Sequence, residues 1–297
     1  MFNAVSIRKT KYSIMKFILF FLTASIPLFG LSQNLHVDVF GGIATYQGDL
    51  QNKRFTLEQS NPAVGLGLSY DLSPRLSVRT GFTYGVVEGD DKKNTSVKGN
   101  EIRNLNFKST ISEVHLGLEY NFFNMEGTSI TPYVFAGIAG FKFNPYTRDT
   151  AGSKIFLQPL STEGQGLSAY PDRKEYKLTQ LSIPFGGGIK LKLSETIQLG
   201  LEVGLRKLFT DYLDDVSTTY VDEATLFNAK GAKAVELAFR GKEINPSLIY
   251  PPANEQRGNA KRKDLYYFSG IRVSKLLGGN SGGGSRKNNT GCPRSVF

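Results

Sequence analysis

The sequence predicts an all-β fold, an eight-stranded antiparallel up-and-down transmembrane β-barrel. Three observations predict it: eight segments in which apolar and polar residues alternate, connections that are by turns short and long, and almost no helical periodicity. Barrels of the bacterial outer membrane show this signature, with short periplasmic turns at one end and long extracellular loops at the other.

The alternating segments follow one another, with turn-forming residues between them. In the first segment Leu35, Val37 and Val39 are separated by polar residues, and the later segments repeat this pattern. A tilted strand needs about 9–11 residues to cross hydrocarbon, and most segments are about that long. They span residues 35–43, 64–72, 76–84, 114–122, 133–143, 181–193, 197–209 and 264–273.

The two alternating residue sets differ in kind. One set is mainly Leu, Val, Ile, Phe and Tyr, and the other is mainly Gly, Ser and charged residues. The interior of an eight-stranded barrel is only wide enough for side chains, so small residues and ion pairs fit the lumen. A soluble lipocalin-like calyx, the alternative eight-stranded meander, would need the large apolar set inside. The composition of the two sets therefore favours a membrane barrel.

Aromatic residues and one irregularity add detail to this barrel. Phe107 and Ile111 are out of phase with Val114 onward, which predicts a bulge near Ser112-Glu113. Aromatic belts are expected at both membrane interfaces. They are predicted to contain Tyr70, Tyr120, Phe122 and Phe123 at the turn end, and Tyr84, Phe141, Phe143, Phe209 and Tyr267 at the loop end.

The N-terminus predicts export. Lys16 precedes an apolar run over residues 17–29, and small residues follow it, which is typical of a secretory signal peptide. We expect a signal peptide over residues 1–32, with Met15 as a possible true start, and a membrane anchor is the weaker alternative because Pro27 interrupts the run. The barrel would then occupy residues 33–277, followed by a flexible, Gly/Ser-rich periplasmic tail over 278–297.

Charged residues on the predicted inward face indicate how the lumen is filled. A carboxylate in a narrow lumen must be paired or it will take up a proton. We therefore predict an internal ion-pair network rather than a path for ions or protons. Its predicted members are Asp38, Arg79, Glu119, Lys190, Lys192, Glu202, Arg206 and Arg272.

The sequence offers little for catalysis. Its two histidines, His36 and His115, fall outside the long loops, so a serine or water nucleophile would have no conventional base there. We expect no enzyme activity and no cofactor. The net charge of +10 is spread along the chain and does not favour nucleic acid as a partner of an exported protein.

Residues 210–222, TDYLDDVSTTYVD, form the most acidic segment. We interpret its aspartates as hydrated, or paired with basic residues at the other limb of the same loop. A divalent cation bound by carboxylate oxygens is the alternative. The aspartates concerned are Asp211, Asp214 and Asp215, and the basic residues are Arg257, Lys261, Arg262 and Lys263.

Four long segments resemble one known family. They are GGIATYQGDLQ (41–51), ITPYVFAGIAGFKFNP (130–145), LQPLSTEGQG (157–166) and GLRKLFTDYLDDVSTTYVD (204–222). They are similar to the PorG family, an outer-membrane β-barrel component of the type IX secretion system of Bacteroidetes-type bacteria. The resemblance implies a role in protein secretion or gliding. It also implies a periplasmic ring as the partner, built from a lipoprotein (PorK) and a second protein (PorN).

This resemblance directs attention to the tail. Both termini of an eight-stranded barrel are expected in the periplasm, and the lone Cys292 can form no internal disulfide. Cys292 is either a free thiol or one half of an intermolecular disulfide. We hypothesise that Cys292, with Arg286, Lys287 and Arg294, contacts the periplasmic ring. The alternative function is a stand-alone surface barrel whose long loops bind an external ligand.

Overall fold

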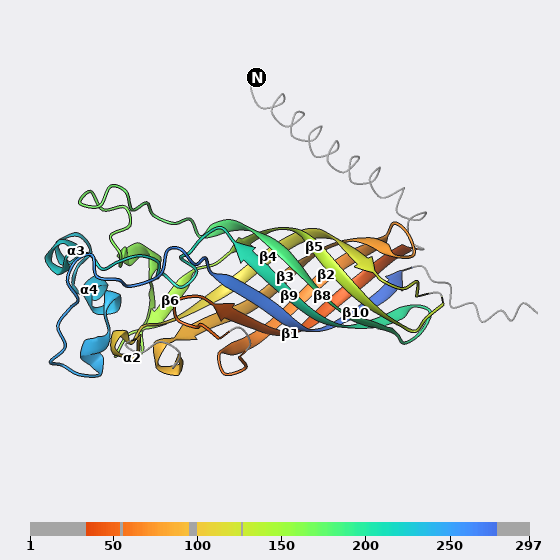
Figure 1. Cartoon of the computed structure of the whole chain (residues 1–297), viewed down its shortest axis with the longest axis horizontal. Coiled ribbons are helices and arrows are strands. Elements are labelled where there is room, and N and C mark those ends of the chain that lie inside the picture. Colours follow the sequence, from red (N-terminus) through yellow and green to blue (C-terminus); the bar gives the residue numbers. More distant parts are fainter. Residues whose placement is uncertain (1–33, 54–55, 95–99, 126, 278–297) are drawn as a thin grey trace, which may run out of the picture.

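The strands close into a barrel. The structure, a computed structural model, describes residues 34–53, 56–94, 100–125 and 127–277. Eight long antiparallel strands pair in the order β3-β2-β1-β10-β9-β8-β5-β4, and β4 pairs with β3 to close the sheet (Figure 1). The predicted eight-stranded antiparallel barrel is confirmed.

The barrel strands differ in length. β4 has 16 residues and β3 has 15, whereas β2 and β9 have 12 each. Since about 9–11 residues suffice to cross hydrocarbon at a tilt, β3 and β4 continue well beyond the predicted span. The barrel strands are β1 (Leu35–Gln47), β2 (Ser60–Asp71), β3 (Leu76–Asp90), β4 (Asn106–Asn121), β5 (Ile130–Lys142), β8 (Thr179–Lys192), β9 (Ile197–Leu208) and β10 (Leu265–Leu277).

Smaller elements lie in the long connections. The hairpin of β6 (Pro145–Arg148) and β7 (Lys154–Phe156) extends the sheet because β6 pairs with the start of β4. No helix among the described residues is long and apolar enough to cross a membrane. The helical elements are η3 (Asp91–Lys93), α2 (Asn100–Arg103), η4 (Gln158–Leu160), α3 (Glu223–Lys230), α4 (Ala232–Ala238) and η5 (Gly241–Glu243).

The two ends of the barrel differ. At one end tight turns join the strands, and the backbone N–H of Leu193 donates to the carbonyl of Ile197 at 2.9 Å. β1 begins and β10 ends here, because Leu35 pairs with Leu277. The opposite end carries the long connections (Figure 1). We call these the turn end and the cap end.

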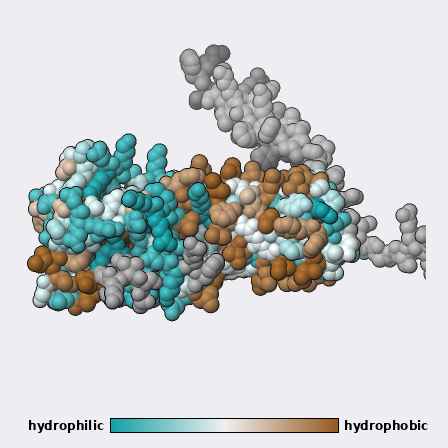
Figure 2. All heavy atoms as spheres, in the orientation of Figure 1, coloured by the Kyte–Doolittle hydropathy of each residue, from teal (hydrophilic) through white to brown (hydrophobic). Residues whose placement is uncertain are grey.

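The exterior of the barrel is apolar. Large aliphatic side chains point outward and are left open to the surroundings: Leu66, Ile138 and Leu181 are 65%, 67% and 69% exposed. Figure 2 shows hydrophobic residues over the barrel and hydrophilic residues over the cap end. An apolar surface this continuous is not found on soluble monomers. It suits surroundings of hydrocarbon.

The interior changes character along the barrel axis. It is polar near the turn end and apolar near the cap end, where Phe107 and Ile111 are buried inside the barrel. β4 pairs with β3 from Asn106 to Tyr120 without a shift in register. The predicted bulge near Ser112-Glu113 is therefore wrong. The side-chain type on the inward face changes from polar to apolar, while the phase of the strand continues.

The predicted aromatic belts are only partly present. Phe141 and Phe143 are 1% exposed because the odd-numbered residues of β5 point inward, so their predicted place in the cap-end belt is wrong. Tyr267 is also buried, beside Thr56 of the loop between β1 and β2. Of the predicted belt residues, those exposed on the outside are Tyr120, Phe122 and Phe123 near the turn end, and Tyr84 and Phe209 near the cap end.

The long connections fold into a cap, which we define as residues 157–176 and 210–263. The cap has its own apolar cluster, in which the ring of Tyr220 meets the rings of Phe239 and Tyr250 edge to face at 6.1 and 5.7 Å. α3 begins at Asp222, whose carboxylate accepts a hydrogen bond from the backbone N–H of Thr225 at 2.8 Å. The cap is thus a folded structure seated on the apolar interior of the barrel (Figure 1).

Glycines in the wall make room for large lumen side chains. A Cβ at Gly188 would lie 1.9 Å from the carbonyl oxygen of Leu201 and 3.0 Å from the ring of Tyr133. We expect Gly188→Ala to destabilise the barrel by about 1–3 kcal/mol, the usual cost of overpacking. The midpoint of urea unfolding in lipid vesicles measures this. Gly140→Ala is the matched control, because nothing lies within 4 Å of its Cβ position. Equal midpoints for the two variants would contradict the prediction.

Candidate functional site

Glu202 of β9 lies at the centre of the lumen. Arg79 of β3 reaches across the barrel and donates two hydrogen bonds to its carboxylate, at 2.8 and 3.0 Å. The hydroxyl of Tyr133 donates a third at 2.9 Å. Paired arginine–carboxylate bonds of this kind are strong and fixed in direction. They join β3, β5 and β9 across the lumen.

Glu119 of β4 collects three cations. Its carboxylate, 1% exposed as a side chain, forms ion pairs with Lys190 and Arg272, and with Arg79 at 3.4 Å. Arg272 also lies 3.7 Å from Glu202. The two carboxylates and three cations therefore form one connected network across five strands.

A second pair lies nearer the cap end. Arg206 of β9 donates to both carboxylate oxygens of Glu113, at 2.9–3.2 Å, and the hydroxyl of Tyr266 donates to the same carboxylate at 2.6 Å. Arg206 was predicted as a lumen residue, but Glu113 was not, because the predicted fourth strand began only at Val114. A strict count of odd residues back from Glu119 would have found it.

Two predicted members of the network lie apart from it. Lys192 is at the turn end, where its ammonium group bonds to Glu195 at 3.0 Å, so its predicted place in the lumen network is wrong. Lys192 is the last residue of β8, two positions beyond Lys190, and its side chain reaches the turn. Asp38 is buried in the lumen, but its Oδ1 atom makes no hydrogen bond.

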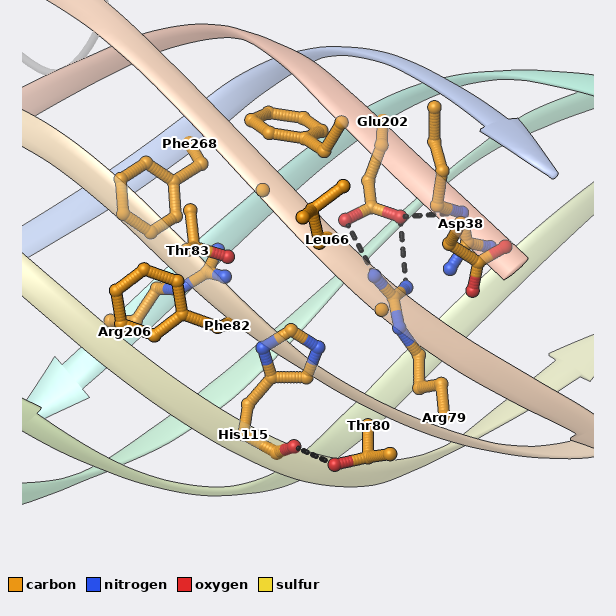
Figure 3. Close-up of a pocket in the computed structure, with 14 residues that line it drawn as sticks. Asp38, Leu66, Arg79, Thr80, Phe82, Thr83, His115, Glu202, Arg206 and Phe268 are labelled. Carbon is orange, nitrogen blue, oxygen red and sulfur yellow. Dashed lines mark hydrogen bonds and ion pairs between the residues drawn. The ribbon is translucent and has the colours of Figure 1, made fainter. Parts of the chain in front are cut away.

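A small cavity lies beside Asp38 and Arg79. Its volume is about 30 Å³, and Arg272 and Glu202 also line it. Figure 3 shows the guanidinium of Arg79 directed at the carboxylate of Glu202, with His115 nearby. A cavity of this size holds about one or two water molecules. The described lumen is therefore packed with side chains, and we find no continuous channel through its ion pairs.

The base of the cap contains a group of carboxyl groups without a matching cation. The hydroxyl of Tyr46, at the cap end of β1, donates to Asp214 at 2.5 Å and lies 3.3 Å from Asp264. Burial, together with neighbouring aspartates, raises the pKa of Asp214 and of Asp264 well above the usual range. A protonated carboxyl group at this place can sit beside another carboxyl without repulsion.

Asp215 and Glu163 anchor the cap through one arginine. Glu163 is buried and pairs with Arg257 at 2.9 Å, and it accepts the backbone N–H groups of Ser217 and Thr218, each at 2.9 Å. Asp215 accepts hydrogen bonds from Thr162 at 2.5 Å and Tyr176 at 2.7 Å. Burial raises the pKa of Asp215 to about 6. Arg257 was one of the partners predicted for these aspartates, and it forms an ion pair with Asp215 at 4.0 Å, although its closest carboxylate is that of Glu163.

Three aspartates of residues 210–222 are buried, whereas Asp222 is exposed. Asp211, Asp214 and Asp215 are at most 3% exposed, so their interpretation as hydrated loop residues is wrong. Asp211 accepts a hydrogen bond from Ser217 at 2.7 Å, and each of the three points to different partners. Within the described residues no group of His, Cys, Asp and Glu is arranged to hold a metal ion. These side chains hold the cap together.

One serine, aspartate and histidine meet at the turn end. Asp71 accepts from Ser77 at 2.6 Å and lies 2.9 Å from the His36 ring. In a catalytic triad the histidine stands between serine and aspartate, so that it can take the proton of the serine. Here the aspartate stands between them, and Ser77 has no base. Across the described chain no hydroxyl is hydrogen-bonded to a histidine ring.

The predicted signal peptide and the predicted tail contacts lie outside the described residues. Residues 1–32, the predicted signal peptide, lie outside the described part of the chain. The tail residues proposed to contact a partner, Cys292, Arg286, Lys287 and Arg294, also lie outside the described residues.

The chain is similar to one family model and to several solved structures. A family model described as a domain of unknown function (DUF6089) matches residues 13–155. No curated protein sequence matches the chain. Solved structures similar to the chain include Neisserial surface protein A (9% identity, TM-score 0.40, covering 82% of this chain and 97% of that one). The outer membrane protein OprG of Pseudomonas aeruginosa is 13% identical (TM-score 0.40, 82% and 96% covered), and the outer membrane enzyme PagL is 15% identical (TM-score 0.31, 81% and 99% covered).

The carboxylate of Glu119 should be essential for the stability of the lumen network. Glu119→Gln leaves three cations in the lumen with one fewer charge to balance them, and breaking a buried ion pair costs about 3–5 kcal/mol. Unfolding by urea in lipid vesicles measures the loss. Glu195→Gln is the control, because that carboxylate is 90% exposed in its pair with Lys192. A Glu119 variant as stable as the Glu195 variant would contradict the network.

The cap should lose stability as the pH rises. Folding raises the pKa of Asp264, so the folded cap keeps a proton that the unfolded chain releases near pH 4. Stability therefore falls from about pH 4 upward until the pH passes the folded-state pKa, and Asp211, with a pKa raised by burial to about 6, contributes over pH 4–6.

Asp264→Asn removes one titrating group but keeps an oxygen to accept the backbone N–H of Leu213. We expect a flatter pH profile and a more stable cap at pH 8, measured by hydrogen exchange of residues 211–217. Asp222→Asn, at an exposed helix N-cap, is the control and should leave the profile unchanged. An identical pH profile for Asp264→Asn and the unmodified protein would refute the explanation.

Proposed function

We propose that the protein is a non-enzymatic outer-membrane component of the type IX protein secretion machinery, which anchors or positions a periplasmic ring at the outer membrane. The observation that carries the proposal is the lumen, which buried ion pairs fill at one level and aromatic side chains at the next. A barrel whose lumen is filled in this way is suited to anchor or position a partner protein. The assignment to the type IX secretion system rests on similarity to the PorG family, which lies in residues 41–51, 130–145, 157–166 and 204–222.

The arrangement of the chain ends supports this role. β1 begins and β10 ends at the turn end, so segments before residue 35 and after residue 277 leave the barrel on one side. In an outer-membrane barrel with short periplasmic turns, that side is the periplasm. Contacts from the tail, including Cys292, would then reach a ring of PorK-like and PorN-like proteins without crossing the membrane.

The cap supports a second candidate function, a surface barrel that binds an external ligand. A cavity of about 380 Å³ opens between the cap and the loop after β1, and it is mainly polar. However, its buried arginines already have partners. Arg103 pairs with Asp91 at 2.7 Å, and Arg257 pairs with Glu163. Of the three arginines that line the cavity, Arg262 is the one on its exposed edge with donors left for a ligand.

Deletion of the gene tests the two functions together. We expect loss of the secreted proteins from the culture medium, restored by the full chain but not by a chain that ends at Leu277. Removing the tail leaves every described residue in place, so the barrel and the cap still fold. The truncated barrel should also fail to retain ring proteins when purified from membranes.

Arg262→Ala is the matched variant for the second function, since it alters the exposed edge of the polar cavity. It should restore secretion fully if the ring role holds. Normal secretion in the deletion strain would overturn the proposal, and loss of secretion with Arg262→Ala alone would favour the surface-binding function. Cys292→Ser, compared on non-reducing gels of intact cells, shows whether the tail forms a disulfide with its partner.

A further inference from the structure

Four lysines lie where the apolar band of the barrel meets the cap. They belong to adjoining strands or to the residues just before them, because β5, β8, β9 and β10 are neighbours in the sheet. All four are exposed on the outside of the molecule. Figure 2 shows hydrophilic side chains gathered at this boundary. We name Lys142, Lys177, Lys207 and Lys263 the rim lysines.

The strand register places these lysines along one edge. Lys142, the last residue of β5, pairs with Thr179 at the start of β8, which puts Lys177 just beyond it. Lys207 of β9 pairs with Leu265 of β10, which puts Lys263 just beyond that pair. One sector of the barrel rim therefore carries a row of ammonium groups.

Lys207 has the most telling position. Outward-facing residues on β9 alternate, so Leu205 and Phe209 flank it on the same face, and Phe209 is 59% exposed. Ile183 of β8 lies opposite. A lysine among lipid-facing apolar residues extends its stem along them and places its ammonium group at the level of the lipid headgroups. The side chain of Lys207 thus reaches the headgroup layer.

Within the part of the chain that the structure describes, three of the rim lysines, Lys142, Lys177 and Lys207, have no carboxylate in ion-pair contact, whereas Lys263 lies near the carboxylate of Asp211. None of the four is in a salt bridge among the described residues, and Asp211 and Asp264 close to Lys263 are buried in the base of the cap. Asp172 and Glu175, in the loop before β8, form no salt bridge with these lysines among the described residues. The other side of the barrel differs, because there Lys108 pairs with Glu88 at 2.6 Å.

We infer that the rim lysines bind the phosphate groups of phosphorylated lipids in the leaflet around the cap end. The site is formed by an ammonium group at headgroup level on each of several adjoining strands, above aliphatic side chains that contact the acyl chains. This inference rests on the membrane location contained in the proposed function. It adds a lipid partner to one sector of the rim, where the phosphate of the lipid provides the charge that the protein lacks.

Binding can be measured with the purified full chain in detergent, by native mass spectrometry with diphosphoryl lipid A and with phosphatidylcholine as probes. We expect lipid A to bind in preference to phosphatidylcholine, and this preference to weaken with salt. The double variant Lys142→Gln, Lys207→Gln should bind lipid A about thirtyfold more weakly, since each basic residue near an anionic surface contributes about fivefold.

The control is Lys108→Gln, which removes a lysine already paired with Glu88 and should leave binding unchanged. The single variant Lys207→Arg keeps the charge at this position and leaves Lys142 unmodified. It should bind lipid A nearly as well as the unmodified chain. Heat-modified migration on gels verifies that each variant is folded. Equal binding of lipid A by the double variant and the unmodified chain would overturn the inference, as would equal binding of the two probes.

Failure of the proposed secretion role gives a different result. If the chain binds lipid A through the rim lysines but its deletion leaves secretion unchanged, the lipid site is supported and the secretion role is rejected. A chain that does not insert into lipid vesicles at all would overturn both.

Discussion

Charge balance inside a narrow barrel is the constraint on which the rest of this structure depends. An eight-stranded lumen has no room for the water that would hydrate a lone charge, so each buried charge needs an opposite one beside it. The described lumen contains four cations and four carboxylates, and all of the carboxylates except Asp38 lie in ion pairs. The cations are Arg79, Lys190, Arg206 and Arg272, and the carboxylates are Asp38, Glu113, Glu119 and Glu202. Because partners come from different strands, the ion pairs also fix the strands against one another.

The remaining layers follow along the barrel axis. Above the ion pairs, rings such as Phe107, Phe141 and Tyr266 fill the barrel, and no charge is left to balance. Above the rings, Asp214 and Asp264 meet Tyr46 without a cation and keep a proton instead. Neutrality is thus reached in two ways, by ion pairing within the barrel and by protonation under the cap.

The sequence was sufficient for the barrel and insufficient for the cap. Alternation located all eight strands because the side-chain period of a strand depends only on the backbone, and it placed Arg79, Glu119 and Glu202 on one face. It failed where tertiary packing changed the meaning of a residue. Phe107 and Ile111 suggested a bulge because apolar side chains inside the barrel were not expected there. The role of Glu163 depends on Arg257, 94 positions away, and no local pattern indicates such a contact.

The unequal strand lengths have a consequence of their own. A cylinder of eight equal strands looks the same from every direction in the plane of the bilayer. Rotation about its axis would not change the surface that it offers to a neighbouring protein. β3 and β4 rise beyond their neighbours on one side, and β6 continues the rise by pairing with β4. The molecule therefore has a front and a back as seen from above. A partner that contacts it from one side can impose a fixed azimuth on the whole barrel.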